Sequence, residues 1–210
     1  GETWLSPEEA LLSMAGEGYS RITVQSLHVI PGEEFHGLVQ TIHKLKMGPL
    51  AQVDIKLGAP LLNTSHDLIY TTQVLFDILP IERTPEQAVV FMGHGTHHGG
   101  DVYYAALQYH LWNSDPLAFM GTVEGVPALD DIIPSLKEQG ATQVWLVPFM
   151  SVAGDHARND MAGAEPDSWK STLEAQGFEV FVILKGMGEY PAMASLWLDH
   201  LEQAIAGTGH

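Results

Sequence analysis

Hydrophobic and polar positions along this chain follow a repeating order: a short apolar run, a turn with Gly or Pro, then an amphipathic stretch. In the first half, residues 21–29 and 53–57 read as strands. Residues 33–45 and 65–79 read as helices, and the first of these carries Phe35, Leu38, Val39, Ile42 and Leu45 on one face. An earlier helix begins at Ser6-Pro7 and ends near Ala15. Repeated strand–turn–helix units predict α/β architecture with parallel sheets.

The same order begins again after residues 80–85, a polar connector that Pro80 and Pro85 bound. Strands are expected at 88–92, 118–123, 143–149 and 179–184, and helices at 102–111, 129–139, 169–176 and 191–206. We therefore expect an N-terminal α/β domain over 1–84 and a C-terminal one over 85–190, with a cleft between them. Because a parallel sheet normally has about five or six strands, we also expect that one more strand and helix preceded residue 1.

Composition and charge narrow the classes of function. The 210 residues are 45% hydrophobic, and 26 acidic residues against 9 basic ones give a net charge of −17 without a basic cluster. This balance argues against nucleic acid and anionic membrane surfaces as partners. The chain has no cysteine, so a metal site must use His and carboxylate ligands.

Two features of the sequence bear on location. No apolar run reaches about 18 residues, so no membrane span is expected. The chain begins with GETWLSPEE, which resembles neither a signal peptide nor a native start with Met. We expect a cytoplasmic protein, with the periplasm as the alternative because the native N-terminus is not visible.

Unusual polar residues follow three successive strands of the second half. His94 lies in a GHG turn after strand 88–92, Glu124 follows strand 118–123, and His156 follows strand 143–149 in the segment AGDH. The carboxyl ends of parallel strands meet at one edge of a sheet, where α/β proteins bind their ligands. Two imidazoles and a carboxylate form an open ligand set for a divalent ion such as cobalt, iron, nickel or zinc.

Each of these residues also has a purely structural interpretation. The His-rich turn around His94 could lie in solvent, and Glu124 could be an ordinary loop acid. His156 could cap the following turn or pair with Asp155, while Arg158, Asn159 and Asp160 could support it as a second layer. His97 and His98 are expected at the rim rather than among the ligands. His94, Glu124 and His156 all lie at strand ends, and this shared position favours a functional role for the three.

Five segments resemble the anaerobic-type cobalt chelatases (CbiK type, sirohydrochlorin cobaltochelatase), relatives of the class II chelatases that include ferrochelatase. They are QSLHVIPGEEF (25–35), VVFMGHGTHH (89–98), GTVEGVP (121–127), VPFMSVAGDHARNDMAG (147–163) and DSWK (167–170). The resemblance implies two flavodoxin-like domains with the active cleft between them. It also implies that a C-terminal helix, 191–210, packs back on the first domain. The family begins with a strand ending in an SFGTS-like segment, which is missing from this chain.

The resemblance also implies a lyase that inserts Co²⁺ into sirohydrochlorin for cobalamin biosynthesis, a branch of porphyrin-type metabolism. The family's metal-binding and catalytic positions fall on His94, Glu124 and His156. Imidazole can act there as ligand or as base near neutral pH. His28 would face the cleft from the first half, unless it is a hydrogen-bonded core residue, and Glu34 could line it too. Arg158 is a candidate donor to the substrate carboxylates.

Other functions remain open at this stage. The same ligands would serve Fe²⁺ insertion for sirohaem synthesis. A non-catalytic metal or haem carrier is a second alternative, with His36 as an axial ligand at a contact between subunits of a homo-oligomer, although such a His is more often solvated surface. A hydrolase is a third, and the absence of GxSxG and HExxH motifs argues against it.

Overall fold

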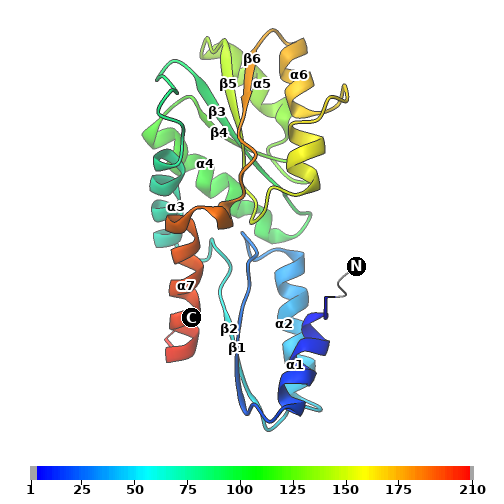
Figure 1. Ribbon diagram of the computed structural model, residues 1–210. Coiled ribbons are helices and arrows are strands. Elements are labelled where there is room, and N and C mark those ends of the chain that lie inside the picture. Colours follow the sequence, from blue (N-terminus) through cyan, green and yellow to red (C-terminus); the bar gives the residue numbers. More distant parts are fainter. Residues whose placement is uncertain (1–3, 209–210) are drawn as a thin grey trace.

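The computed structural model describes residues 4–208, which form two α/β halves stacked end to end (Figure 1). The smaller half contains helix α1 (Pro7–Gly16), strand β1 (Arg21–Gln25), helix α2 (Glu33–Lys46) and strand β2 (Asp54–Gly58). The two strands pair in parallel, from Arg21 opposite Asp54 to Gln25 opposite Gly58. Leu11 of α1 and Ile42 of α2 pack with Ile22 and Ile55 of the strands in one small core.

The larger half holds a four-stranded parallel sheet in the order β4-β3-β5-β6. Its elements are α3 (Ser65–Asp77), β3 (Ala88–Gly93), η1 (Gly99–Asp101), α4 (Val102–Ser114), β4 (Ala118–Thr122), α5 (Leu129–Glu138), β5 (Gln143–Pro148), η2 (His156–Met161), α6 (Trp169–Ala175) and β6 (Glu179–Val182). A short turn η3 (Met187–Glu189) leads to the last helix, α7 (Pro191–Ala206). The expected α/β class with parallel sheets is confirmed.

Strand β3 lies in the middle of this sheet and is buried along its whole length. Val89 and Phe91 point to the core shared with α3, α4 and α7, whereas Val90 and Met92 point to the core under α5 and α6. A strand covered on both faces needs apolar residues at every position. The continuous apolar run of 88–92, visible in the sequence, has this cause.

Two helices connect the halves. Helix α3 lies within residues 1–84, yet its Leu68, Val74 and Leu75 pack into the core that contains Phe91. Helix α7 begins beside the larger half and runs back along β1 and β2, where the Lys56 ammonium donates to the carbonyl of Ile205 at 2.8 Å (Figure 1). The smaller sheet therefore lies between α7 on one face and α1 with α2 on the other.

The elements agree closely with the expected ones, with local differences at strand ends. Strand β1 ends at Gln25, four residues before the expected Val29, because the chain then turns into a loop. There the backbone N–H groups of Leu61 and Leu62 donate to the carbonyls of His28 and Val29. The π-helical turn η2 was not expected from the sequence. Within residues 4–208, no helix is both long and apolar enough to cross a bilayer.

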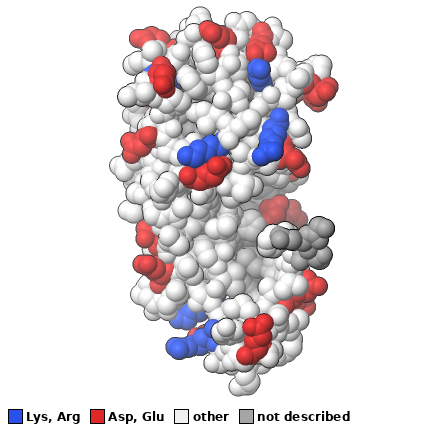
Figure 2. All heavy atoms as spheres, viewed as in Figure 1, with Lys and Arg blue, Asp and Glu red and all other residues white. Residues whose placement is uncertain are grey.

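Acidic side chains are scattered over both halves on the face shown in Figure 2, with the few Lys and Arg side chains between them. The net charge of −17 is thus distributed rather than gathered in one patch there. Recognition of any charged ligand must therefore depend on local groups.

Candidate functional site

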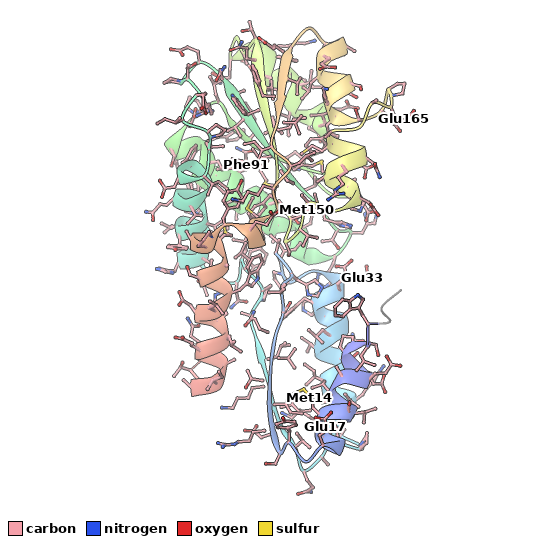
Figure 3. The ribbon with its side chains drawn as sticks, in the orientation of Figure 1. Met14, Glu17, Glu33, Phe91, Met150 and Glu165 are labelled. Atoms are coloured by element: carbon pink, nitrogen blue, oxygen red, sulfur yellow. The ribbon has the colours of Figure 1, made fainter. Side chains whose placement is uncertain are left out.

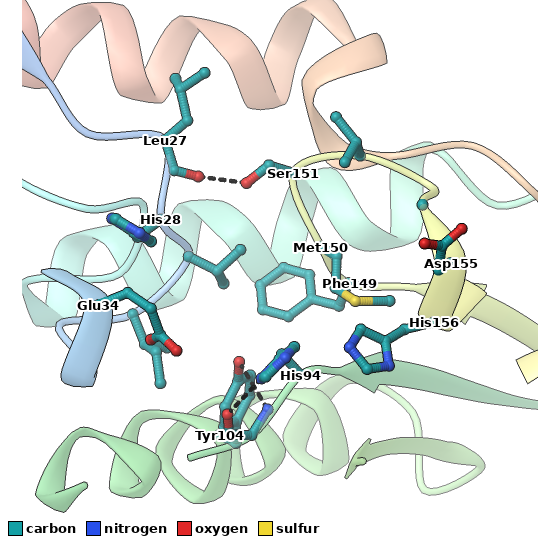
Figure 4. Close-up of a pocket in the computed structure, with 15 residues that line it drawn as sticks. Leu27, His28, Glu34, His94, Tyr104, Phe149, Met150, Ser151, Asp155 and His156 are labelled. Atoms are coloured by element: carbon teal, nitrogen blue, oxygen red, sulfur yellow. Dashed lines mark hydrogen bonds between the residues drawn. The ribbon is translucent and has the colours of Figure 1, made fainter. Parts of the chain in front are cut away.

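A cleft of about 320 Å³ opens between the two halves. The smaller half contributes residues 27–30 and Glu34 to its lining, and the larger half contributes residues 149–156 with gaps, together with His94, Gly95 and Tyr104. Met150 lies at this junction, while the buried Phe91 lies inside the larger half (Figure 3). At one end, the Ser151 hydroxyl donates to the carbonyl of Leu27 and so bridges the walls (Figure 4).

His94 lies immediately after β3, at the carboxyl end of the buried strand. Its carbonyl accepts the backbone N–H of Glu124 at 2.8 Å, and its Nδ1 lies 2.9 Å from the carbonyl of Gly95. A carbonyl can only accept, so Nδ1 must carry the hydrogen. The neutral ring therefore keeps its lone pair on Nε2, the form needed for a metal ligand or a base.

Gly95 allows the chain to turn away from the sheet at this point. Its φ is +81°, and a Cβ there would lie 2.4 Å from the backbone nitrogen of Gly125. Only glycine fits both the left-handed backbone and this close approach. The turn after His94 and the loop that carries Glu124 are consequently packed directly on each other.

His156 opens the π-helical turn η2, which follows β5. Its Nδ1 lies 2.5 Å from Oδ2 of Asp160, one turn further along. A carboxylate oxygen accepts this hydrogen, so His156 also presents an unprotonated Nε2 when neutral. Of the two partners considered from the sequence, the structure pairs His156 with Asp160 rather than with Asp155.

The two imidazoles lie together on one wall of the cleft (Figure 4). Their ring centroids are 4.8 Å apart and the ring planes are nearly perpendicular, at 88°. The sequence separates these residues by more than sixty positions, and the parallel pairing of β3 with β5 brings them together. This proximity is what two ligands of one ion require.

Glu124 is near this pair in the backbone but not in the side chain. Its N–H is bonded to the carbonyl of His94, yet its side chain is exposed and lies outside the cleft lining. Within the described residues 4–208, no group of three or more His, Cys, Asp or Glu side chains is placed to hold a metal ion. In this conformation the site therefore consists of two imidazoles, with a carboxylate on the adjoining loop.

His28 and Glu34 lie on the opposite wall (Figure 4). The Nδ1 atom of His28 is 2.7 Å from the hydroxyl of Ser26. Burial lowers the pKa of His28, and the nearby Glu34 carboxylate raises it by a smaller amount. The neutral form of His28 is favoured, so this wall presents an uncharged imidazole to the cleft.

Two residues that sequence reasoning missed hold the His94 turn. The Gly95 N–H donates to the Tyr104 hydroxyl at 3.4 Å, and burial raises the pKa of that phenol to about 12, so it stays protonated. The Asp101 carboxylate accepts the N–H groups of Thr96 at 3.1 Å and of Val126 at 2.9 Å, which ties the His94 loop to the Glu124 loop. An acid at the start of a helix was the available signal for Asp101.

The remaining candidates lie outside the cleft lining. Arg158 is exposed, and its Nε donates to the carbonyl of Ala153 at 3.2 Å. His36 is exposed on α2, where its Nδ1 lies 2.9 Å from the carbonyl of Gly32 and its ring packs against that of His98, with centroids 4.6 Å apart. His97 is exposed.

Comparison with known families gives one match over nearly the whole chain: residues 3–206 match the family described as cobalt chelatase (CbiK). Sirohydrochlorin cobaltochelatase CbiKC of Nitratidesulfovibrio vulgaris is 42% identical over 198 residues, which cover 94% of this chain and 70% of that protein. Sirohydrochlorin cobaltochelatase of Salmonella typhimurium is 40% identical over 200 residues, covering 95% of this chain and 74% of the relative.

Solved structures with the same fold are more distant in sequence. SirB from Bacillus subtilis with Fe³⁺ has a TM-score of 0.66 at 16% identity and covers 98% of this chain and 80% of that one. The sirohydrochlorin chelatase SirB from Bacillus subtilis subspecies spizizenii, in complex with cobalt, has a TM-score of 0.61 at 15% identity. The match covers 99% of this chain and 79% of that one. At these identities the likeness concerns the fold, which is the chelatase fold.

Proposed function

The chain belongs to the cobalt chelatase (CbiK) family, and from this premise we propose that it is a sirohydrochlorin cobaltochelatase. In this reaction Co²⁺ enters the tetrapyrrole and the two pyrrole N–H protons leave. The observation that carries the assignment of the site is the pair of imidazoles, His94 and His156, 4.8 Å apart on one wall of the cleft.

We propose that His94 and His156 hold the incoming ion through Nε2. Both rings use Nδ1 for internal hydrogen bonds, to the Gly95 carbonyl and the Asp160 carboxylate, so both Nε2 lone pairs are available. Imidazole nitrogen suits Co²⁺ better than it suits calcium or magnesium. The remaining coordination positions stay open for water and then for pyrrole nitrogen.

Removal of the pyrrole protons needs a base beside the metal and a path outward. One of the two imidazoles can accept a proton once the ion has passed to the macrocycle, because a free neutral Nε2 is basic near pH 7. Glu124 is exposed on the loop bonded to His94. In this proposal its carboxylate attracts the cation and passes protons to solvent.

The substrate's own charge determines how it can lie. Sirohydrochlorin carries many carboxylates, whereas the cleft lining contains the acids Glu34 and Asp155 and, within residues 4–208, no Lys or Arg. We propose that the flat ring enters between the walls, with neutral His28 on the face opposite His94. The carboxylates of sirohydrochlorin would then point out to the rim of the cleft, where Arg158 on η2 is an exposed donor.

A metal-insertion assay tests the site. Purified protein is mixed with sirohydrochlorin and Co²⁺, and the change in the absorption spectrum of the tetrapyrrole gives the rate. His94→Ala and His156→Ala should abolish insertion while circular dichroism stays unchanged. His43→Ala, an exposed His on α2, is the matched control and should keep full activity. Normal turnover by either cleft variant would refute the site assignment.

Insertion of Fe²⁺ is the closest alternative, because imidazole ligands discriminate poorly between Fe²⁺ and Co²⁺. Parallel assays with each ion under anaerobic conditions compare kcat/KM directly, and a higher value for Fe²⁺ would favour sirohaem synthesis. Haem ligation by His36 is tested separately. If His36 ligates haem, the purified protein should show a haem absorption band that His36→Ala removes.

A further inference from the structure

The contact between His156 and Asp160 goes beyond the ligand set proposed above. Asp160 Oδ2 lies 2.5 Å from Nδ1 of His156, and both residues are on the π-helical turn η2. The turn closes with the N–H of Ala162 donating to the carbonyl of Ala157 at 3.2 Å, five residues back. Such π-turns are rare and are frequently found at functional sites.

The turn has a buried inner side and a partly exposed outer side, and His156 on the outer side lines the cleft. Ala157 and Met161 are fully buried in the core under α5 and α6. His156 and Asp160 each precede one of these anchors and are partly exposed. The two anchors are four residues apart, as are His156 and Asp160, so the same backbone that fixes the anchors also fixes the pair. Packing of this kind keeps a site residue in one orientation.

The two proposed ligands are therefore oriented by different means. His94 is held by a backbone carbonyl, that of Gly95, which no side-chain substitution removes. His156 is held by a side chain that can be changed. A carboxylate behind a metal-binding His fixes the ring tautomer and makes the ligand more basic.

We propose that Asp160 is a positioning residue for metal capture: its carboxylate binds the Nδ1 hydrogen of His156 and keeps the Nε2 lone pair directed into the cleft. This inference rests on the proposed function, since it assigns Asp160 to the same site. Asp160 itself does not contact the ion. Its effect is on the affinity for Co²⁺ rather than on the binding of the tetrapyrrole.

Two substitutions remove the contact in different ways. Asp160→Ala deletes the acceptor. Asp160→Asn keeps the shape of the side chain, but the Asn amide can donate to Nδ1 of His156. The ring hydrogen of His156 then moves to Nε2 and occupies the lone pair that would bind the metal. Asp160→Glu retains the carboxylate. Asp167→Asn is the matched control, because Asp167 is an exposed acid near the same turn and outside the cleft lining.

The readouts are the Kd for Co²⁺ measured by calorimetry without tetrapyrrole, the visible spectrum of bound Co²⁺, and the split of kinetic effects between the two substrates. Loss of an outer carboxylate of this kind typically weakens metal affinity or activity about 10- to 100-fold. We therefore expect Asp160→Asn and Asp160→Ala to raise both the Kd and the KM for Co²⁺ by about 10- to 100-fold. The KM for sirohydrochlorin should not change, Asp160→Glu should recover part of the affinity, and Asp167→Asn should match the wild type.

The results separate this inference from the proposed function. Wild-type Co²⁺ affinity in Asp160→Asn, together with loss of binding in His156→Ala, would overturn the role of Asp160 and leave the site in place. Unchanged Co²⁺ binding in both variants would refute the site itself. A loss that Asp160→Glu does not recover, with an altered circular dichroism spectrum, would mean that Asp160 only stabilises the turn, and would also overturn the proposal.

Discussion

Substituting Gly95 by Ala should damage the proposed metal site more than the fold. Gly95 has φ +81°, a left-handed conformation that costs an L-residue about 1–2 kcal/mol. The added Cβ would lie 2.4 Å from the backbone nitrogen of Gly125 and 2.9 Å from its Cα, so the loop must move by about 1 Å to reach ordinary contact. Overpacking of this kind costs about 1–3 kcal/mol.

Together these effects predict a loss of about 2–5 kcal/mol in the free energy of unfolding. A typical domain is stable by about 5–15 kcal/mol, so most of the Gly95→Ala protein should remain folded at 25 °C. Activity should fall further, because the displaced loop carries Glu124 and is bonded to His94. A misplacement of about 1 Å in an active site can cost about 100-fold in rate.

Urea unfolding measures the stability, and the metal-insertion assay measures kcat/KM. Gly99→Ala is the control in the same loop: Gly99 lies outside the left-handed region, and a Cβ there would meet no described atom within 4 Å. It should resemble the wild type in both assays. If Gly95→Ala were as stable and as active as Gly99→Ala, backbone contact between the two loops would not be what positions the site.

Three further predictions concern groups around the cleft. Burial lowers the pKa of His28, so the unfolded chain binds a proton more readily than the folded one, and the fold loses stability as the pH falls through and below 6.5. Urea unfolding at pH 7 and pH 5 should show a smaller loss of stability for His28→Gln than for the wild type. Equal losses in the two proteins would contradict this. Tyr104→Phe leaves the Gly95 N–H unpaired and should cost about 1 kcal/mol in the same measurement, whereas a neutral effect would mean that the 3.4 Å contact contributes nothing. At a concentration about 100 times its Kd, Co²⁺ should stabilise the wild type by about 2.7 kcal/mol in thermal unfolding, and the same gain in His94→Ala would place the ion elsewhere.

The local sequence was sufficient to predict most helices and strands and the parallel α/β class. Apolar periodicity reports whether a segment has one buried face or two, and the run of 88–92 indicated a strand buried on both sides. The family resemblance, confirmed by the match over residues 3–206, rested on motifs that are equally local. Strand order and the return of α7 to the smaller sheet instead depend on contacts between distant residues.

The candidate site divides in the same way. Strand-end position was enough to predict that His94 and His156 would meet, because parallel strands bring their carboxyl ends to one edge. It could not predict side-chain direction: Glu124 shares that edge in its backbone, but its carboxylate is exposed. Whether His156 pairs with Asp155 or Asp160 was decided by the π-helical turn.

The sequence by itself determined which segments are buried, which residue types can bind a metal, and which backbone elements carry them. These properties depend on hydrophobicity and chemistry at each position. Only the tertiary structure decided which side chains face one another across the cleft, because that depends on loop conformation and packing between residues far apart in the chain. The orientation of His156 by Asp160, on a turn anchored by two buried residues, belongs to this second kind.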